Sequence, residues 1–222
     1  MGNPRLVLAS NSPRRRELLA LGGWKFESAS PEVDESQRPG EEPGAYVLRL
    51  AENKARACAS TNVPESIVIA ADTTVVDGKT ILGKPGNASE AAEMLGKLRD
   101  RTHQVYSGLC VIRTSDGNLG HDLCVTQVPM RNYDVQEIEA YVASGDPLDK
   151  AGAYAIQHPV FHPVERMSGC YASVMGLPLC HLARTLRPFD ITPLTDISKE
   201  CQAWLNYACP ISARVLQGEQ VG

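Results

Sequence analysis

Short apolar strand patterns alternate with amphipathic helix patterns along this chain. Residues 5–10 (RLVLAS) and 66–71 (SIVIAA) are continuous apolar runs typical of buried strands. Residues 42–60, between them, carry an apolar stripe at helical spacing. Two or three further strand patterns lie in residues 103–133, around an Asp-Gly turn. This interleaving predicts an α/β fold with a mixed, twisted sheet flanked by helices.

Capping residues indicate where several of the helices begin. Ser12 is suited to cap a helix that starts at Pro13 and ends at a Gly-Gly pair. Asn87 and Asp134 are suited to cap two more helices, each with a glutamate three residues later. Beyond Pro188 the pattern weakens, and we expect one weak helix and a frayed end.

Charge and composition exclude several classes of protein. A net charge of −4 over 222 residues argues against binding polymeric nucleic acid. The N-terminus lacks a signal-peptide pattern, and no apolar run approaches the roughly 18 residues of a membrane span. The seven cysteines form no CxxC pair, so we expect reduced, mostly buried thiols in a cytoplasmic protein. The histidines show no paired metal-ligand spacing, so no zinc site is expected.

Three consecutive arginines, residues 14–16, fall in the first turn of the helix that begins at Pro13. The helix N-terminus carries partial positive charge, so these side chains are unfavourable there unless an anion is present. A polyphosphate would attract the free backbone amides and the guanidinium groups together. On a helical wheel Arg15 faces the core, Arg14 flanks it and Arg16 turns toward solvent. The alternative is a solvated basic turn neutralised by nearby glutamates.

Three charged side chains lie beside apolar segments. Lys54 falls inside the apolar stripe of helix 42–60, so its ammonium group must reach the surface or point into a cleft. Asp72 lies where the strand SIVIAA runs out, the usual place for functional groups in open α/β sheets. Lys84 precedes Pro85, which holds its backbone extended. The alternatives are a turn-forming aspartate and solvated lysines.

The loop PEVDE, residues 31–35, brings three carboxylates within four residues. Glu32, Asp34 and Glu35 would suffice to hold Mg²⁺ beside phosphates; the alternative is a solvated surface loop. The sequence contains no GxSxG or Walker A motif, and its serines have no adjacent base, so a serine nucleophile is unsupported.

Seven short motifs occur in a specific order over roughly residues 5–187: LASNSPRRRELL, PEVDE, LAENKA, ADTTVV, LGKP, LDKAGAYAIQ and VMGLPL. Together they resemble the Maf family of nucleoside triphosphate pyrophosphatases. The resemblance implies two lobes with a deep nucleotide cleft, as in inosine triphosphatases, and a homodimer. It implies an enzyme that hydrolyses the α–β phosphoanhydride to the monophosphate and pyrophosphate with Mg²⁺ or Mn²⁺. Residues 1–187 would be the pyrophosphatase domain, and residues 188–222 a tail to which nothing carries over.

The resemblance also implies roles for individual residues. Asp72 would be the proton acceptor, with Glu35 near the metal and the water, and both carboxylates would hold the metal. The residues assigned to the substrate phosphates are Ser10, Arg15, Lys54 and Lys84.

Three positions distinguish substrate types within this family. Arg14, Thr73 and Gln157 are similar to the type that acts on dTTP and UTP, whereas the type associated with 7-methyl-GTP has tryptophan, glutamine and glutamate. The segment AIQHP replaces the usual GIQG. We therefore keep two alternatives: a pyrophosphatase for 7-methyl-GTP or another modified nucleotide, and a nucleotide-binding division regulator with little turnover.

Overall fold

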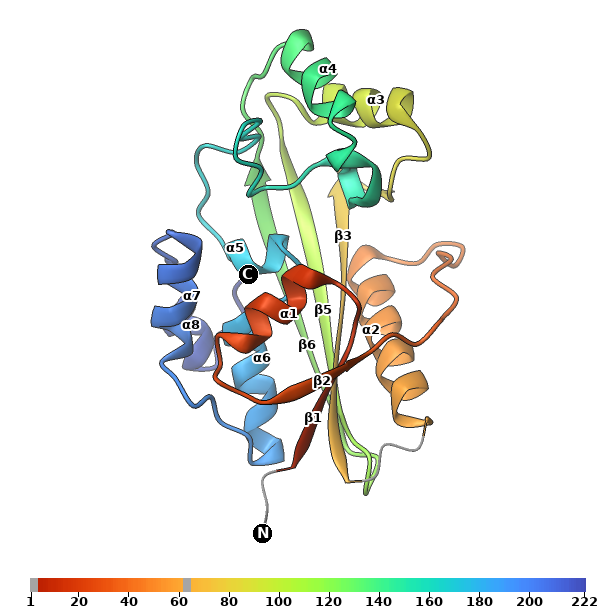
Figure 1. The fold of residues 1–222 in the computed structure, drawn as a ribbon. Helices are drawn as coiled ribbons and strands as arrows, with labels where there is room; N and C mark the ends of the chain where they lie inside the picture. Colours follow the sequence, from red (N-terminus) through yellow and green to blue (C-terminus); the bar gives the residue numbers. More distant parts are fainter. Residues whose placement is uncertain (1–3, 62–64) are drawn as a thin grey trace.

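A six-stranded mixed sheet forms the centre of the computed structural model, which describes residues 4–61 and 65–222 (Figure 1). The strand order is β2-β1-β3-β5-β6, and β4 pairs with β3. β1 is parallel to both β2 and β3, whereas the β3–β4, β3–β5 and β5–β6 pairs are antiparallel. The predicted mixed sheet is confirmed. The strands are β1 (Arg5–Ala9), β2 (Phe26–Ala29), β3 (Ser66–Asp77), β4 (Thr80–Leu82), β5 (Thr102–Arg113) and β6 (Leu119–Pro129).

Helices cover both faces of the sheet. The α-helices are α1 (Pro13–Ala20), α2 (Pro43–Ala59), α3 (Ala88–Leu98), α4 (Val135–Ala143), α5 (Tyr171–Val174), α6 (Leu179–Leu186), α7 (Ile197–Leu205) and α8 (Ser212–Leu216). The 3₁₀ helices are η1 (Asp146–Asp149), η2 (Ala151–Ala153) and η3 (Arg187–Phe189). α2 covers one face, α1 and α6 lie on the other, and α3 and α4 lie at one end of the long strands (Figure 1).

The predicted apolar stripe of α2 is the face that packs on the sheet. Val47, Leu50, Ala51, Ala55 and Cys58 are the buried residues of this helix. Burial of a stripe at this spacing follows from the helical period and accounts for the placement of α2 over β3 and β5. Every cysteine of the described chain is a free thiol, and all but one are buried, as the sequence predicted.

The predicted caps are present. The Ser12 side chain accepts a hydrogen bond from a backbone N–H of α1, and Asn87 does the same for α3. Asp134 and Glu137 form a complete capping box on α4. In α3 the second half of the box differs, because the carboxylate of Glu90 accepts from the backbone of the residue before the cap.

Strand β3 is longer than predicted, and this corrects the position of Asp72. The strand continues through Asp72 to Asp77, so Asp72 lies in its middle rather than at its end. The residues after Asp72 are the β-branched sequence TTVV, which favours continued extension. The ladder to β5 runs from Ile67 to Val76 and pairs Asp72 with Gly108.

Residues 188–222 fold onto the rest of the chain, so the predicted frayed end is wrong. This segment forms two helices, α7 and α8, whose buried residues include Ile197 and Val215. Both belong to the main core together with residues of α6. The indole Nε1 of Trp24 donates to the carbonyl of Thr192 at 3.0 Å, which joins the segment to the loop after α1.

Within residues 4–61 and 65–222, no helix is both long enough and apolar enough to cross a membrane.

Candidate functional site

A pocket of about 540 Å³ gathers nearly all the predicted site residues. It lies among the start of α1, the loop after β2, α2, β3 and the segments around η2 and α5. Asp72 is outside the lining itself but is joined to it through Lys54. The predicted residues that line the pocket are Ser10, Arg14, Arg15, Glu35, Lys54, Thr73, Lys84 and Gln157.

Lys54 bridges two carboxylates at the base of the site. Its Nζ lies 2.6 Å from Asp72 Oδ1 and 2.6 Å from Glu35 Oε1. The side chains of Lys54 and Asp72 are only 13% and 10% exposed, whereas that of Glu35 is 57% exposed. The sequence places Lys54 in the apolar stripe of α2, so its ammonium group was expected either to reach the surface or to enter a cleft. In the structure it enters the pocket.

Gly108 allows α2 to approach this part of the sheet closely. A Cβ built on Gly108 would lie 2.7 Å from the backbone of Val47, far inside van der Waals contact. Gly108 is the residue of β5 that pairs with Asp72. Helix α2 therefore comes closest to the sheet next to Asp72, the residue whose carboxylate contacts Lys54 of that helix.

The two carboxylates differ in their proton affinity. Burial raises the pKa of Asp72, although the positive charges of Lys54 and Arg15 oppose that rise. Burial also acts to raise the pKa of Glu35, but the hydrogen bond and charge of Lys54 outweigh it, so this pKa is lowered. The net shifts are therefore opposite: the pKa of Asp72 lies above its ordinary value, and that of Glu35 lies below its own.

Arg15 is held in place by three hydrogen bonds. Its Nε donates to the carbonyl of Gly176 at 2.9 Å, and its terminal nitrogens donate to Ser10 Oγ at 3.3 Å and to Thr73 Oγ1 at 3.4 Å. Burial lowers the pKa of the Arg15 guanidinium. Gly176 has a φ of +109°, and a Cβ there would lie 3.2 Å from Arg15 Nε, so glycine suits this contact.

The orientations predicted for the three arginines are confirmed, whereas their separate roles stay a prediction. Arg15 is the member fixed toward the core, and Arg14 lines the pocket beside it. Arg16 is exposed, and its Nη1 donates to the carbonyl of Asn11 at 3.0 Å. Two of the three positive charges are therefore available to an anion in the pocket.

The hydroxyl of Thr73 belongs to a directed chain of hydrogen bonds. Ser107 Oγ donates to the carbonyl of Ser173 at 2.8 Å, which commits its one proton. Ser107 must then accept from Thr73 Oγ1, 2.8 Å away, and Thr73 in turn accepts from Arg15. This chain fixes the orientation of Thr73 and links the pocket to α5.

The acidic loop contributes one carboxylate to the pocket rather than three. Glu35 is positioned by Tyr46, whose hydroxyl donates to the Glu35 carbonyl at 2.9 Å. Asp34 instead accepts from the backbone N–H of Ser36 at 2.9 Å and stabilises the loop. Glu32 is not among the pocket-lining residues. Of the three carboxylates of this loop, Glu35, the one to which the resemblance assigns a role, is therefore the one that lines the pocket.

Lys150 and Asp149 also line the pocket, and the sequence reasoning did not single them out. The Lys150 ammonium group donates to Asp149 Oδ1 at 2.6 Å and to Asp146 Oδ1 at 3.0 Å. The ammonium group of Lys150 therefore offsets part of the negative charge of the two aspartates at the pocket edge. The motif LDKAGAYAIQ contained a sequence signal for this site, because a lysine directly precedes an apolar run there. The structure shows that this lysine is buried.

The donors at the base of the site fit a divalent cation such as Mg²⁺ or Mn²⁺. Carboxylate oxygens are the ligands these ions prefer, and Mg²⁺ is commonly held by one or two carboxylates plus phosphates and water. Asp72 and Glu35 meet this requirement because both already contact the same positively charged atom, Lys54 Nζ.

Comparison with known proteins identifies the family. The family model described as "Maf-like protein" matches residues 5–189. A dTTP/UTP pyrophosphatase of Anaeromyxobacter dehalogenans (strain 2CP-1 / ATCC BAA-258) is 48% identical over 187 residues, which cover 83% of this chain and 93% of the relative. One from Hahella chejuensis (strain KCTC 2396) is 44% identical over 200 residues, covering 88% and 98%. Among solved structures, the Staphylococcus aureus Ham1 protein gives a TM-score of 0.36 at 14% identity, covering 57% of this chain and 71% of that protein. The match of the family model over most of the chain, with these relatives, means that the chain belongs to the Maf family.

Proposed function

We propose that this chain hydrolyses dTTP and UTP to the nucleoside monophosphate and pyrophosphate. The names of its relatives support this activity. The observation that carries the proposal is the Lys54 bridge between Asp72 and Glu35, beside Arg15 in one pocket. A basic carboxylate next to several cations is the arrangement that hydrolysis of a polyphosphate requires.

In the proposed reaction Asp72 accepts the proton of the attacking water. Burial raises the pKa of Asp72 above its ordinary value, which makes the carboxylate a stronger base. The water oxygen bonds to the α-phosphorus, the bond from that phosphorus to the bridging oxygen breaks, and pyrophosphate leaves. Asp72 then returns its proton to solvent.

The cations of the pocket hold the phosphates and stabilise the leaving pyrophosphate. Arg15 and Ser10, already joined by a hydrogen bond, lie at the N-terminus of α1, where free backbone amides also attract anions. Lys54 and Lys84 neutralise charge that grows on the pyrophosphate as the bond breaks. Preorganised groups of this kind reduce the reorganisation needed during the reaction.

Glu35 and Asp72 would hold the divalent cation. Mg²⁺ or Mn²⁺, when bound, supplies positive charge next to the phosphate oxygens and lowers the pKa of water. The pKa of Glu35 is lowered by Lys54 against the effect of burial, so this carboxylate remains ionised and available as a ligand.

Arg14, Thr73 and Gln157 are proposed to select the nucleotide. All three line the pocket that contains the phosphate-binding groups. The Gln157 amide is exposed there and can both donate to and accept from the edge of a base. We infer that the pocket is the nucleotide cleft between two lobes of a domain spanning residues 1–187, against which residues 188–222 pack. The homodimer and the cytoplasmic location stay predictions.

A substrate panel tests the proposed function. Initial rates with dTTP, UTP, CTP and 7-methyl-GTP, with Mg²⁺ or Mn²⁺, give kcat/KM for each nucleotide. We expect dTTP and UTP to exceed the other two, and Gln157→Glu to shift the preference toward 7-methyl-GTP. Gln136→Glu makes the same charge change on an exposed residue of α4 and should leave the ranking unchanged. Tight binding without turnover, or a wild-type preference for 7-methyl-GTP, would contradict the proposal.

A further inference from the structure

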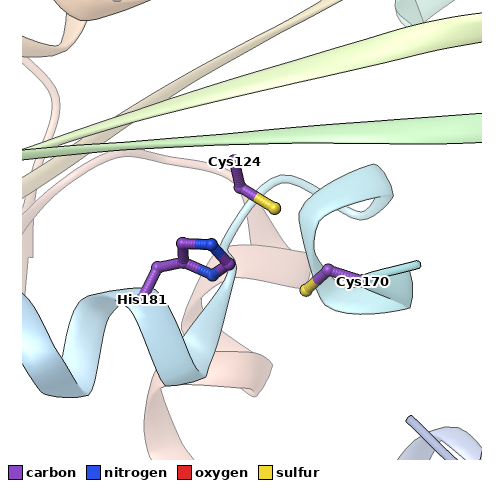
Figure 2. Close-up of side chains that lie close together, drawn as sticks. All are labelled: Cys124, Cys170 and His181. Carbon is purple, nitrogen blue, oxygen red and sulfur yellow. The ribbon is translucent and has the colours of Figure 1, made fainter. Parts of the chain in front are cut away.

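Two thiols and an imidazole converge beside the sheet, away from the residues that line the nucleotide pocket. Cys124 belongs to β6, Cys170 directly precedes α5 and His181 lies in α6, and all three are buried. One ligand atom from each lies within 4.8 Å of the other two. Figure 2 shows the two sulfur atoms and the imidazole ring directed into the same small space.

The hydrogen bond of His181 leaves one ring nitrogen free to act as a ligand. Its Nε2 lies 2.8 Å from the carbonyl oxygen of Val221, and a carbonyl can only accept, so Nε2 carries the proton. Nδ1 then presents a lone pair; within residues 4–61 and 65–222 it makes no well-aligned hydrogen bond, and the group that the ring interacts with on this side is the thiol of Cys124. A buried imidazole nitrogen that makes no well-aligned hydrogen bond, next to two thiols, is available to coordinate a metal ion. A metal-binding histidine typically makes such a bond to a carbonyl through its other nitrogen.

The chemistry of these donors selects the ion. Two thiolates and an imidazole suit a borderline-soft ion such as Zn²⁺ and do not suit Mg²⁺, which prefers oxygen ligands. We propose that Cys124, Cys170 and His181 bind a Zn²⁺ ion that joins β6, α5 and α6. The hydroxyl of Ser173 neighbours Cys124 and adds a further polar atom beside the two thiols. Each thiol loses its proton as its Zn–S bond forms, and two protons are released per ion.

The zinc site would stabilise the wall of the nucleotide pocket. Cys170 directly precedes α5, and Ser173 lies within it. The carbonyl of Ser173 accepts the hydrogen bond from Ser107, whose hydroxyl in turn accepts from Thr73. Arg15 donates to the carbonyl of Gly176, which follows α5. An ion bound to Cys170 therefore restrains the segment that positions both pocket residues.

Metal analysis of the full chain tests this inference independently of nucleotide hydrolysis. Protein purified without chelators or a metal-affinity tag is analysed for zinc by mass spectrometry, and metal-stripped protein is then titrated with Co²⁺. We expect one zinc per chain and, with Co²⁺, the intense near-ultraviolet absorption of cobalt–thiolate bonds. Co²⁺ bound by the carboxylates of the nucleotide pocket gives no such band, so the readout is specific to the thiols.

Cys124→Ala and Cys110→Ala form a matched pair of variants. Both remove a fully buried thiol, and the two cysteines lie on the adjacent strands β6 and β5. We expect Cys124→Ala to lose the zinc and the cobalt–thiolate band, and Cys110→Ala to keep both. If Cys124→Ala does not fold, the stoichiometry and cobalt spectrum of the wild-type chain decide alone. Wild-type protein that contains no zinc and gives no thiolate band, retention of the band in Cys124→Ala, or a native Cys124–Cys170 disulfide in peptide mass spectra would overturn the proposal.

Discussion

Replacing Lys54 by methionine removes the cation that joins the two site carboxylates while keeping an unbranched side chain of similar length. The lost Nζ lies 2.6 Å from both Asp72 Oδ1 and Glu35 Oε1. Glu35 is 57% exposed and can be hydrated where it lies, but the side chain of Asp72 is only 10% exposed. The free-energy cost of the substitution therefore arises mainly from Asp72, which keeps a buried charge without its nearest partner.

The size of this cost follows from the Lys54–Asp72 distance. At an effective dielectric constant of about 20, unit charges 2.6 Å apart attract by roughly 6 kcal/mol. Removing Lys54 also removes the desolvation cost of its own ammonium group, which offsets about half of that loss. We expect Lys54→Met to lower the free energy of unfolding by about 3 kcal/mol near neutral to mildly alkaline pH.

The loss should shrink as the pH falls. Burial already raises the pKa of Asp72 in the folded protein, and removing the positive charge of Lys54 raises it further. A folded-state pKa above the unfolded value means that the folded state binds the proton more tightly. Protonation of Asp72 therefore relieves the buried charge, and the destabilisation is complete only above the folded-state pKa.

Urea unfolding followed by tryptophan fluorescence measures this effect at about pH 8 and about pH 5. Lys97→Met on the exposed face of α3 is the control, which should change the free energy of unfolding by no more than about 0.5 kcal/mol. Equal stabilities of the wild type and Lys54→Met at the higher pH, or a difference that grows as the pH falls, would refute this reasoning.

Two further predictions concern catalysis. Arg15→Ala should lower kcat/KM for pyrophosphate release by about 100-fold or more, because a positioned phosphate-binding group is lost. Arg16→Ala should leave kcat/KM nearly unchanged, because Arg16 is exposed. Equal losses in the two variants would show that the separate roles assigned to Arg15 and Arg16 are mistaken. On the acid side, kcat/KM should fall as Asp72 becomes protonated, and Lys54→Met should move this limb to higher pH because it removes a positive charge that opposes the rise in the pKa of Asp72. A pH–rate profile whose acid limb Lys54→Met leaves in place would contradict the role of Asp72.

Features set by local periodicity could be predicted from the sequence. The buried face of α2 and the caps at Ser12 and Asp134 depend on residues within a few positions of one another. The same periodicity identified Lys54 as a charged side chain within an apolar stripe, whose ammonium group had to reach the surface or enter a cleft. The grouping of the predicted site residues in one pocket agrees with the family resemblance. Motifs that occur in the same order in related proteins indicate a common three-dimensional arrangement, which the local pattern of any one segment does not reveal.

Features set by pairing between distant segments could not be predicted. The position of Asp72 within β3 depends on the long ladder to β5, and the pattern of apolar residues alone ended the strand too early. Asp34 and Glu35 have the same chemistry and are neighbours, yet a backbone hydrogen bond turns one carboxylate away from the pocket. Cys124, Cys170 and His181 come from three separate elements, so no spacing along the sequence indicated that they meet.

Hydrolysis of dTTP in oxygen-18 water tests the central claim most directly. If water activated by Asp72 attacks the α-phosphorus, the label appears in the nucleoside monophosphate and the pyrophosphate stays unlabelled. Asp72→Asn, which keeps the shape of the side chain but is not a base, should lower the rate by about 100-fold or more in a protein that remains folded. Label in pyrophosphate or orthophosphate, or an Asp72→Asn variant as fast as the wild type, would contradict the account.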